Sequence, residues 1–364
     1  MPNALDYVIL RGDLDYNRYP LNEIDLFLCS QLATPDYKNI IGSDINGKTI
    51  SEIADEYFSN HTLDVSNLGV LQSTSVLPML KEMGNSIRFG NAVIYGYDNH
   101  VDFQEEEQFS AITIQLTDDL IVVAYRGTDD TIIGWKEDFN LAIYDEVPAQ
   151  RDALKYLNWA ASQFKGNIIT VGHSKGGNLS LYASIMSDIK IQDRILKAYS
   201  FDGPGFSKEF LETEKYNYVK DKIFTVLSQN AIVGTLLNIA GNVCYVHTTV
   251  EGFMAHDGFS WSVNKTEFIR EDNLSSMSQS VDDIMDRTLN HLTFDEKKDF
   301  IDSLFNALSS TGCVTITDIK SEKLPDMFKV LLSVSLNKNV LFFAENILIS
   351  LNKYGKSKLR AKYD

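Results

Sequence analysis

The stretch TVGHSKGGNL, residues 170–179, most constrains what this chain can fold into. It contains the pattern G-x-S-x-G centred on Ser174, after the β-branched run NIITV and before an apolar-periodic segment. A strand, a tight glycine-lined turn and a helix are the context that a nucleophile elbow requires. The start of the helix also places free N–H groups and a positive dipole end beside the serine hydroxyl. We therefore interpret Ser174 as a nucleophile; a structural glycine-rich turn is the alternative.

Other ligand classes fit the sequence poorly. The phosphate-loop pattern G-x-x-x-x-G-K-[ST] is not met, because Lys175 precedes the glycines. The chain has 33 basic and 50 acidic residues and a net charge of −17, which disfavours nucleic acid or an anionic lipid surface as a partner. The one basic cluster, KYGKSKLRAK near the C-terminus, is interpreted as a solvated tail.

The pattern around the elbow predicts an α/β fold. The runs NAVIYGYD, FSAITIQLT and LIVVAYRG read as strands, with a hairpin turn at 118–120, and after residue 150 short apolar strands alternate with helices. Such alternation implies a mostly parallel sheet covered on both faces. We expect a helical region at 1–85, a core at 86–270 and a helical region at 271–364. Capping boxes at Thr49 and Glu52 and at Thr293 and Glu296 mark helix starts.

A nucleophilic serine needs a base, and the chain has six histidines. His256, in AHDGFSW, follows the last sheet-like strands, which is the usual chain position of the base in such folds. His247 is the alternative. The others are interpreted as structural or surface residues: His173, whose side chain should point away from the hydroxyl of Ser174, and His61, His100 and His291.

The remaining parts of an acyl-transfer site are an oxyanion hole and an acid. We expect the backbone N–H of Lys175 to be one oxyanion donor, and Thr128, in the strand-ending motif RGTDD, to be the second. A turn that only ends the strand is the alternative for RGTDD. Asp202, after the strand ending in SFDG, is the first choice for the acid, with a turn-forming role as its alternative. Asn230 could orient the imidazole without supplying charge, and Asp257 is too close to His256 in sequence to face its ring.

Four motifs of the chain, taken in order, resemble the class-3 (fungal-type) lipase superfamily and, within it, a bacterial lipase-related branch. They are AYRGTDD…GWKEDFN, ITVGHSKGGNLSLYA, SFDGPGF and AHDGFSW. The resemblance covers nearly the whole chain and implies an α/β-hydrolase fold with helical additions at both termini. It also implies Ser174 as nucleophile, His256 as base, and Thr128 and Lys175 as oxyanion donors. In the lipases the acid follows the strand matching IFTVLSQN, where this chain has no carboxylate. Asp138 is interpreted as scaffold that holds Arg126.

The function expected from these residues is hydrolysis of a carboxylic ester or thioester, on a small-molecule or lipid substrate, through an acyl-enzyme at Ser174. A catalytically degenerate protein that binds a lipid or protein partner is the alternative. No cofactor or metal is expected, because no ligand spacing stands out. The segment 231–253, apolar and glycine-punctuated, is interpreted as a lid or pocket wall, or as a buried helix and strand. The N-terminus lacks a signal-peptide pattern and the chain has only three cysteines, so we expect a cytoplasmic location.

Overall fold

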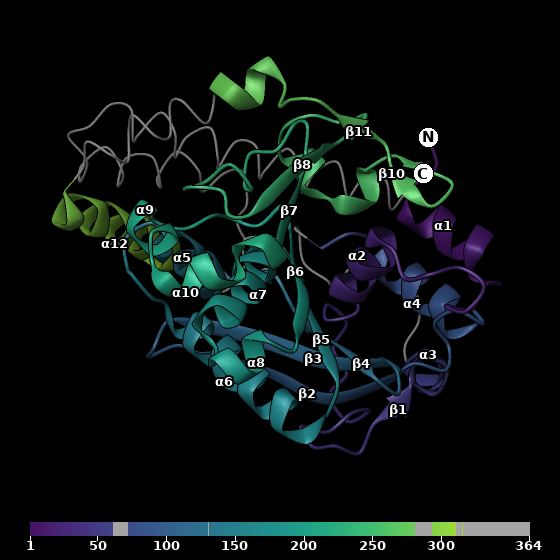
Figure 1. Cartoon of the computed structure of the whole chain (residues 1–364). Coiled ribbons are helices and arrows are strands. Elements are labelled where there is room, and N and C mark those ends of the chain that lie inside the picture. The colour runs from purple at the N-terminus through teal and green to yellow at the C-terminus, as the bar shows by residue number, and fades with distance from the viewer. Residues whose placement is uncertain (61–71, 130, 281–292, 311–314, 316–364) are drawn as a thin grey trace.

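The computed structural model describes residues 1–60, 72–129, 131–280, 293–310 and 315, and these residues build an α/β fold around a nine-stranded sheet (Figure 1). The strands lie in the order β1-β2-β3-β4-β5-β6-β7-β8-β11. Their bounds are β1 Lys48–Thr49, β2 Val93–Asp102, β3 Glu107–Thr117, β4 Leu120–Tyr125, β5 Asn167–His173, β6 Ile195–Phe201, β7 Ile223–Ser228, β8 Asn242–Val246 and β11 Arg270–Glu271. A separate small pair consists of β9 Val263–Asn264 and β10 Glu267–Phe268.

The direction of the strands changes along the sheet in the way that the sequence predicts. The strands β1 to β4 pair antiparallel, and the turn between β3 and β4 falls at 118–119, within the predicted hairpin turn. From β4 to β8 every pair is parallel, and β11 closes the sheet antiparallel to β8. Parallel pairs need long crossover connections, which helices supply here. The prediction of an α/β fold with a mostly parallel central sheet is confirmed.

Helices cover both faces of this sheet (Figure 1). Both predicted capping boxes form: Thr49 with Glu52 before α3, and Thr293 with Glu296 before α12. The main helices are α1 Ala4–Arg11, α2 Glu23–Gln31, α3 Ile50–Asn60, α4 Val76–Gly84, α5 Ile132–Asn140, α6 Pro148–Gln163, α7 Lys175–Met186, α10 Glu214–Val219 and α12 Phe294–Ser310; α8 Ile189–Gln192 and α9 Lys208–Leu211 are single turns.

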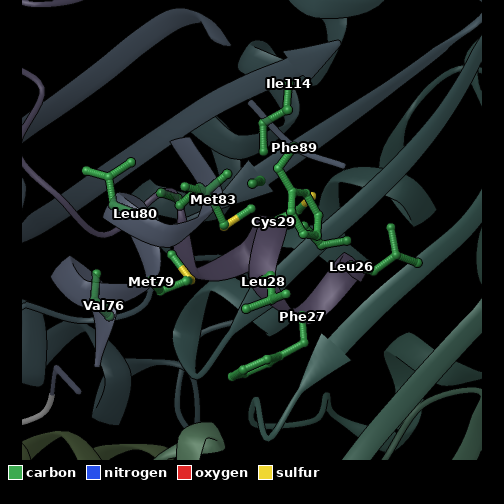
Figure 2. Close-up of a cluster of buried hydrophobic side chains, with 14 of the residues drawn as sticks. Leu26, Phe27, Leu28, Cys29, Val76, Met79, Leu80, Met83, Phe89 and Ile114 are labelled. Carbon is green, nitrogen blue, oxygen red and sulfur yellow. The ribbon is translucent and has the colours of Figure 1, made fainter. Parts of the chain in front are cut away.

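The alternating side chains of β4 divide the core into two layers. Val122 and Ala124 belong to the apolar cluster that includes the N-terminal helices, and Figure 2 shows how α2 and α4 contribute to that cluster. Ile121, Val123 and Tyr125 point to the opposite face, where α6 and α7 pack. Successive strand residues face opposite sides, so a strand buried on both faces must be apolar throughout, as LIVVAY is.

A buried arginine ties the N-terminal segment to the rest of the molecule. The Arg88 guanidinium pairs with Asp25 of α2, and both side chains are fully buried. Arg88 also donates to the carbonyls of Leu14, Tyr19 and Pro20. The ion pair is satisfied by hydrogen bonds on all sides, which is the condition under which a buried charge is tolerated.

The segment 231–253 is in part a sheet element. Its residues Asn242–Val246 form β8, paired with β7, so this part is a strand of the core rather than a lid. The basic cluster at the C-terminus lies outside the described residues. Among the helices of the described residues, none is both long and apolar enough to cross a membrane.

Candidate active site

Ser174 stands at the turn between β5 and α7, in a backbone conformation that serine rarely adopts. Its φ is 59° and its ψ is −135°. A non-glycine residue held there costs about 1–3 kcal/mol, and such strain gathers at functional sites. The turn is closed by hydrogen bonds from the Ser174 N–H to the Phe201 carbonyl at 3.0 Å and from the Gly177 N–H to the Ser174 carbonyl at 2.8 Å. The elbow predicted from G-x-S-x-G is therefore present in the backbone.

The first glycine of the motif is required by close packing between strand and helix. A Cβ atom on Gly172 would lie 1.9 Å from the Gly176 carbonyl oxygen, a distance that no side chain can occupy. This is the close approach of β5 to the first turn of α7 that the pattern predicts.

The motif RGTDD lies directly against the elbow. Because Tyr125 of β4 pairs in register with Gly172 of β5, the residues that follow both strands meet at the same edge of the sheet. A Cβ atom on Gly127 would be 3.0 Å from the Cβ of Ser174. Thr128, the next residue, is buried, and its carbonyl accepts a hydrogen bond from Gln72 at 2.9 Å. The structure thus brings the predicted oxyanion residue beside the predicted nucleophile.

The partner predicted for Asp138 is wrong. Asp138 accepts a hydrogen bond from the Thr128 hydroxyl at 2.6 Å, whereas Arg126 bonds to Asn99 at 2.9 Å and pairs with Asp129 at 3.5 Å. Arg126 continues the direction of β4, next to Ser110 of β3, and this places its side chain against β2 instead of α5. Burial raises the pKa of Asp138 to about 6, and the nearby Lys175 charge opposes that shift.

Lys175 follows the nucleophile, and its side chain turns into the core. Its ammonium donates to the Gln108 carbonyl at 2.7 Å and pairs with Glu137 at 2.8 Å, with both side chains fully buried. Glu137 in turn accepts from the N–H groups of Gln108 and Ala149. The first residue of α7 is thereby fixed to β3 and α5, which orients the N–H groups at the start of this helix.

His256 and Asp202 lie together at the same edge of the sheet. Asp202 follows β6, the direct neighbour of β5, and is fully buried with a φ of 51°. His256 ends the short 3-10 helix Gly252–His256, and its Nδ1 is 2.6 Å from Asp202 Oδ2. An imidazole that donates through Nδ1 to a buried carboxylate keeps Nε2 free to accept a proton, which is the arrangement of a Ser-His-Asp triad.

The residues considered as alternatives for the base and the acid bind other partners. His247 pairs with Glu271 at 2.7 Å, near the sheet edge formed by β11. The amide of Asn230 donates to the Val250 carbonyl at 2.8 Å. Asp257 accepts from the Phe259 N–H at 3.0 Å and begins a turn. Of the carboxylates considered, the structure brings Asp202 to the ring of His256.

His173 has a position that the sequence reasoning missed. Its Nε2 donates to the backbone carbonyl of His256 at 2.7 Å, and the two rings lie with their centroids 4.7 Å apart. Burial, assisted by the neighbouring His256, lowers the pKa of His173 to about 3, so this imidazole is neutral at physiological pH. His173 thus makes a structural contact that positions the loop carrying His256, residues 252–257. The sequence feature that could have indicated this contact is the position of His173 directly before Ser174 in the elbow motif.

The fold is of the α/β-hydrolase type, with a serine elbow. Three features define it: the central parallel strands, the strained serine turn between β5 and α7, and the histidine–aspartate pair at the carboxyl ends of the strands. The chain belongs to the Mbeg1-like family, whose model matches residues 83–306 and so spans the elbow, Asp202 and His256.

Solved structures with some likeness to this chain include lipases. M37 lipase is 18% identical, with 52% of this chain and 69% of that chain covered and a TM-score of 0.35. A mutant form of MDLA from Penicillium cyclopium is 14% identical, with 71% and 90% covered and a TM-score of 0.39. A triacylglycerol lipase from Penicillium expansum is 10% identical, with 73% and 95% covered and a TM-score of 0.32. No curated protein matches the chain.

Proposed function

We propose that the protein is a serine hydrolase that cleaves a carboxylic ester or thioester through an acyl-enzyme on Ser174. The observation that carries the proposal is the buried contact of 2.6 Å between His256 Nδ1 and Asp202 Oδ2, at the sheet edge where the strained Ser174 turn lies. Such a pair supplies both the tautomer and the charge that a catalytic imidazole needs.

In the proposed mechanism, His256 Nε2 accepts the proton of the Ser174 hydroxyl while Oγ bonds to the carbonyl carbon of the substrate. The negative charge on the carbonyl oxygen is held by the backbone N–H groups of Lys175 and Thr128. The bond to the leaving oxygen or sulfur then breaks, and that atom takes the proton from His256. Water repeats the sequence on the acyl-enzyme, releases the acid and restores Ser174.

In this proposal, the hydroxyl and the backbone N–H of Thr128 have different roles because Asp138 binds the hydroxyl. The Thr128 hydroxyl donates to Asp138 at 2.6 Å, so its own proton is engaged while that carboxyl is ionised. The contribution of Thr128 to the oxyanion hole then falls to its backbone N–H, and Asp138 fixes the position of that group. The substrate we propose is a small-molecule or lipid ester.

The test is labelling of the purified full-length protein by a fluorophosphonate probe. We expect labelling of the wild type, none in Ser174→Ala, and a loss of at least about 100-fold in labelling rate in His256→Ala, because triad members act as a unit. Asp202→Asn should lower the rate by a similar factor, because it reverses the tautomer of the imidazole.

The matched control is Ser162→Ala, which removes a hydroxyl on the exposed side of α6 and should leave labelling unchanged. Labelling that survives Ser174→Ala would refute the assignment of the nucleophile. A folded wild type that no probe labels would overturn the proposal and favour a hydrolase-fold protein that binds a lipid or protein partner.

A further inference from the structure

Three side chains of metal-ligand type meet outside the serine site. His100 comes from β2, Glu107 from the start of β3 and Asp152 from α6. His100 Nε2 is 3.2 Å from Asp152 Oδ2 and 3.7 Å from Glu107 Oε1, and one ligand atom of each residue lies within 4.8 Å of the other two. No motif could reveal this cluster, since its members belong to three separate elements.

The topology explains why these residues meet. His100 pairs with Phe109 across the β2–β3 hairpin, and Glu107 is two residues before Phe109. Residues two apart on a strand face the same side, so His100 and Glu107 both point to the face of the sheet that α6 covers. The first turns of α6 then bring Asp152 onto the imidazole.

Glu107 carries an unmatched oxygen that points into the cluster. Its side chain is nine-tenths buried, at 9% exposure, and Oε1 has no hydrogen-bond partner among the described residues. The imidazole nitrogen at 3.7 Å is beyond hydrogen-bond distance. The His100 ring is therefore an ion-pair partner of Glu107 Oε1, but no group of the described residues donates a hydrogen bond to this oxygen. A buried carboxylate oxygen that accepts no hydrogen bond costs about 1–3 kcal/mol, and a cation bound by Glu107, His100 and Asp152 would offset that cost.

The two distances from the His100 ring to the carboxylates fit a coordination sphere. Nitrogen and oxygen ligands at about 2.0–2.2 Å from Zn²⁺ in a tetrahedral arrangement are separated from one another by about 3.3–3.6 Å. The two separations measured from His100 Nε2, 3.2 and 3.7 Å, bracket that range.

The atoms that would not bind the cation are held by second partners. His100 Nδ1 contacts Asp98 Oδ1 at 3.0 Å, and Asp152 Oδ1 accepts from the Lys155 ammonium at 2.6 Å. Metal-binding histidines characteristically donate their other ring N–H to a carboxylate, which fixes the ring and its tautomer. His100 Nε2 and Asp152 Oδ2 contact each other at 3.2 Å, and both lie within 4.8 Å of a Glu107 carboxylate oxygen.

We propose that His100, Glu107 and Asp152 bind a divalent first-row cation, with Zn²⁺ the best match. One imidazole and two carboxylates suit zinc better than Ca²⁺ or Mg²⁺, which prefer oxygen ligands alone, and the two carboxylate charges balance the ion. The His100 and Asp152 side chains are 38% and 22% exposed, so the ion has a path from solvent, and water completes its coordination. The site links the β2–β3 hairpin to α6 and stabilises the folded chain, because it binds that state alone.

The experiment uses full-length protein stripped with EDTA, titrated with Zn²⁺ by calorimetry and with Co²⁺ by visible absorption. We expect one zinc site that weakens at least about 100-fold in His100→Ala and in the isosteric Glu107→Gln, and about 10-fold in Asp98→Asn, which removes only a second partner. Zinc should raise the Tm of the wild type and leave that of Glu107→Gln unchanged.

His247→Ala is the control, because His247 is the imidazole of a pair with a single carboxylate, Glu271. It should keep the wild-type affinity. Circular dichroism is used to check that each variant is folded. Unchanged zinc affinity in both His100→Ala and Glu107→Gln would overturn the proposal, as would a wild type whose Tm and absorption do not respond to either metal; the cluster is then an ion-pair network.

Discussion

At the scale of single residues, Ser174 and Asp202 are both held at positive φ, 59° and 51°, at the ends of neighbouring parallel strands. Serine rarely adopts that region, whereas aspartate adopts it several times more often than most residues, so the packing around the turn must impose it above all on Ser174. The direction of each side chain is set by this backbone, which is why the distance of 2.6 Å between Asp202 and His256 depends on the whole sheet edge.

His173 allows a test of the pH dependence of stability. Its pKa in the folded chain, lowered by burial to about 3, is below the value near 6.5 of an exposed histidine. Between these values the unfolded state binds a proton that the folded state does not, so the stability present above pH 6.5 is lost as the pH falls toward 3. In His173→Gln this loss should shrink by about 1 kcal/mol per pH unit between pH 6 and pH 4.

The measurement is urea unfolding at pH 4, 5 and 6. Gln can still donate to the His256 carbonyl, and His247→Ala, at a partly exposed site, is the control. Equal slopes in wild type and His173→Gln would show that this buried imidazole does not carry the acid sensitivity.

At the scale of elements, the start of α7 is fixed by the buried pair of Lys175 and Glu137, which joins α7, β3 and α5. Hydrogen bonds satisfy the remaining atoms of the pair, so it determines geometry more than it adds net stability. Its position directly after Ser174 connects the packing of α5 with the N–H groups proposed for the oxyanion.

Lys175→Met should lower the free energy of unfolding by about 3–5 kcal/mol, because it leaves the Glu137 charge buried without its partner. Lys175→Met with Glu137→Gln should recover part of that loss, since the uncompensated charge is gone. A double-mutant cycle from urea unfolding measures the coupling energy, and additive losses would contradict the expectation.

At the scale of the whole molecule, the N-terminal helices pack across one face of the sheet against the region that supports the loop carrying His256. Phe27 of α2 is fully buried, and its ring lies 5.4 Å from those of Phe201 and Phe259 and 5.6 Å from that of Trp261. The Trp261 indole in turn donates to the Ala255 carbonyl at 2.9 Å, next to His256. The site and the N-terminal region therefore share one core.

Phe27→Ala should lower the free energy of unfolding by about 3–5 kcal/mol, as expected for removal of a fully buried aromatic ring. It should also lower the rate of probe labelling at Ser174, because the loop that carries His256 loses its support. Leu10→Ala, at an exposed position of α1, is the control and should change neither quantity. The free energy is measured by urea unfolding and the labelling rate by the probe assay. A free energy of unfolding equal to that of Leu10→Ala would refute the supporting role of Phe27.

The predictions about location and domain boundaries stay predictions. The division at residues 85 and 270 is a proposal, and one observation bears on it: α12 packs on α5 through Phe305 and Phe139, with ring centroids 5.5 Å apart. The cytoplasmic location is a proposal that rests on the sequence alone.

The sequence by itself determined the features that depend on residues close together in the chain. The strands β2 to β7, the two capping boxes, the elbow glycines and the chain order of Ser174, Asp202 and His256 follow from periodicity, backbone sterics and turn chemistry. Only the tertiary structure decided which partners meet: Asp138 with Thr128 rather than Arg126, His173 with the His256 carbonyl, and Glu107 with His100 and Asp152. The reason is that these contacts join residues of different elements, and their distances depend on strand register and helix packing, which no local pattern encodes.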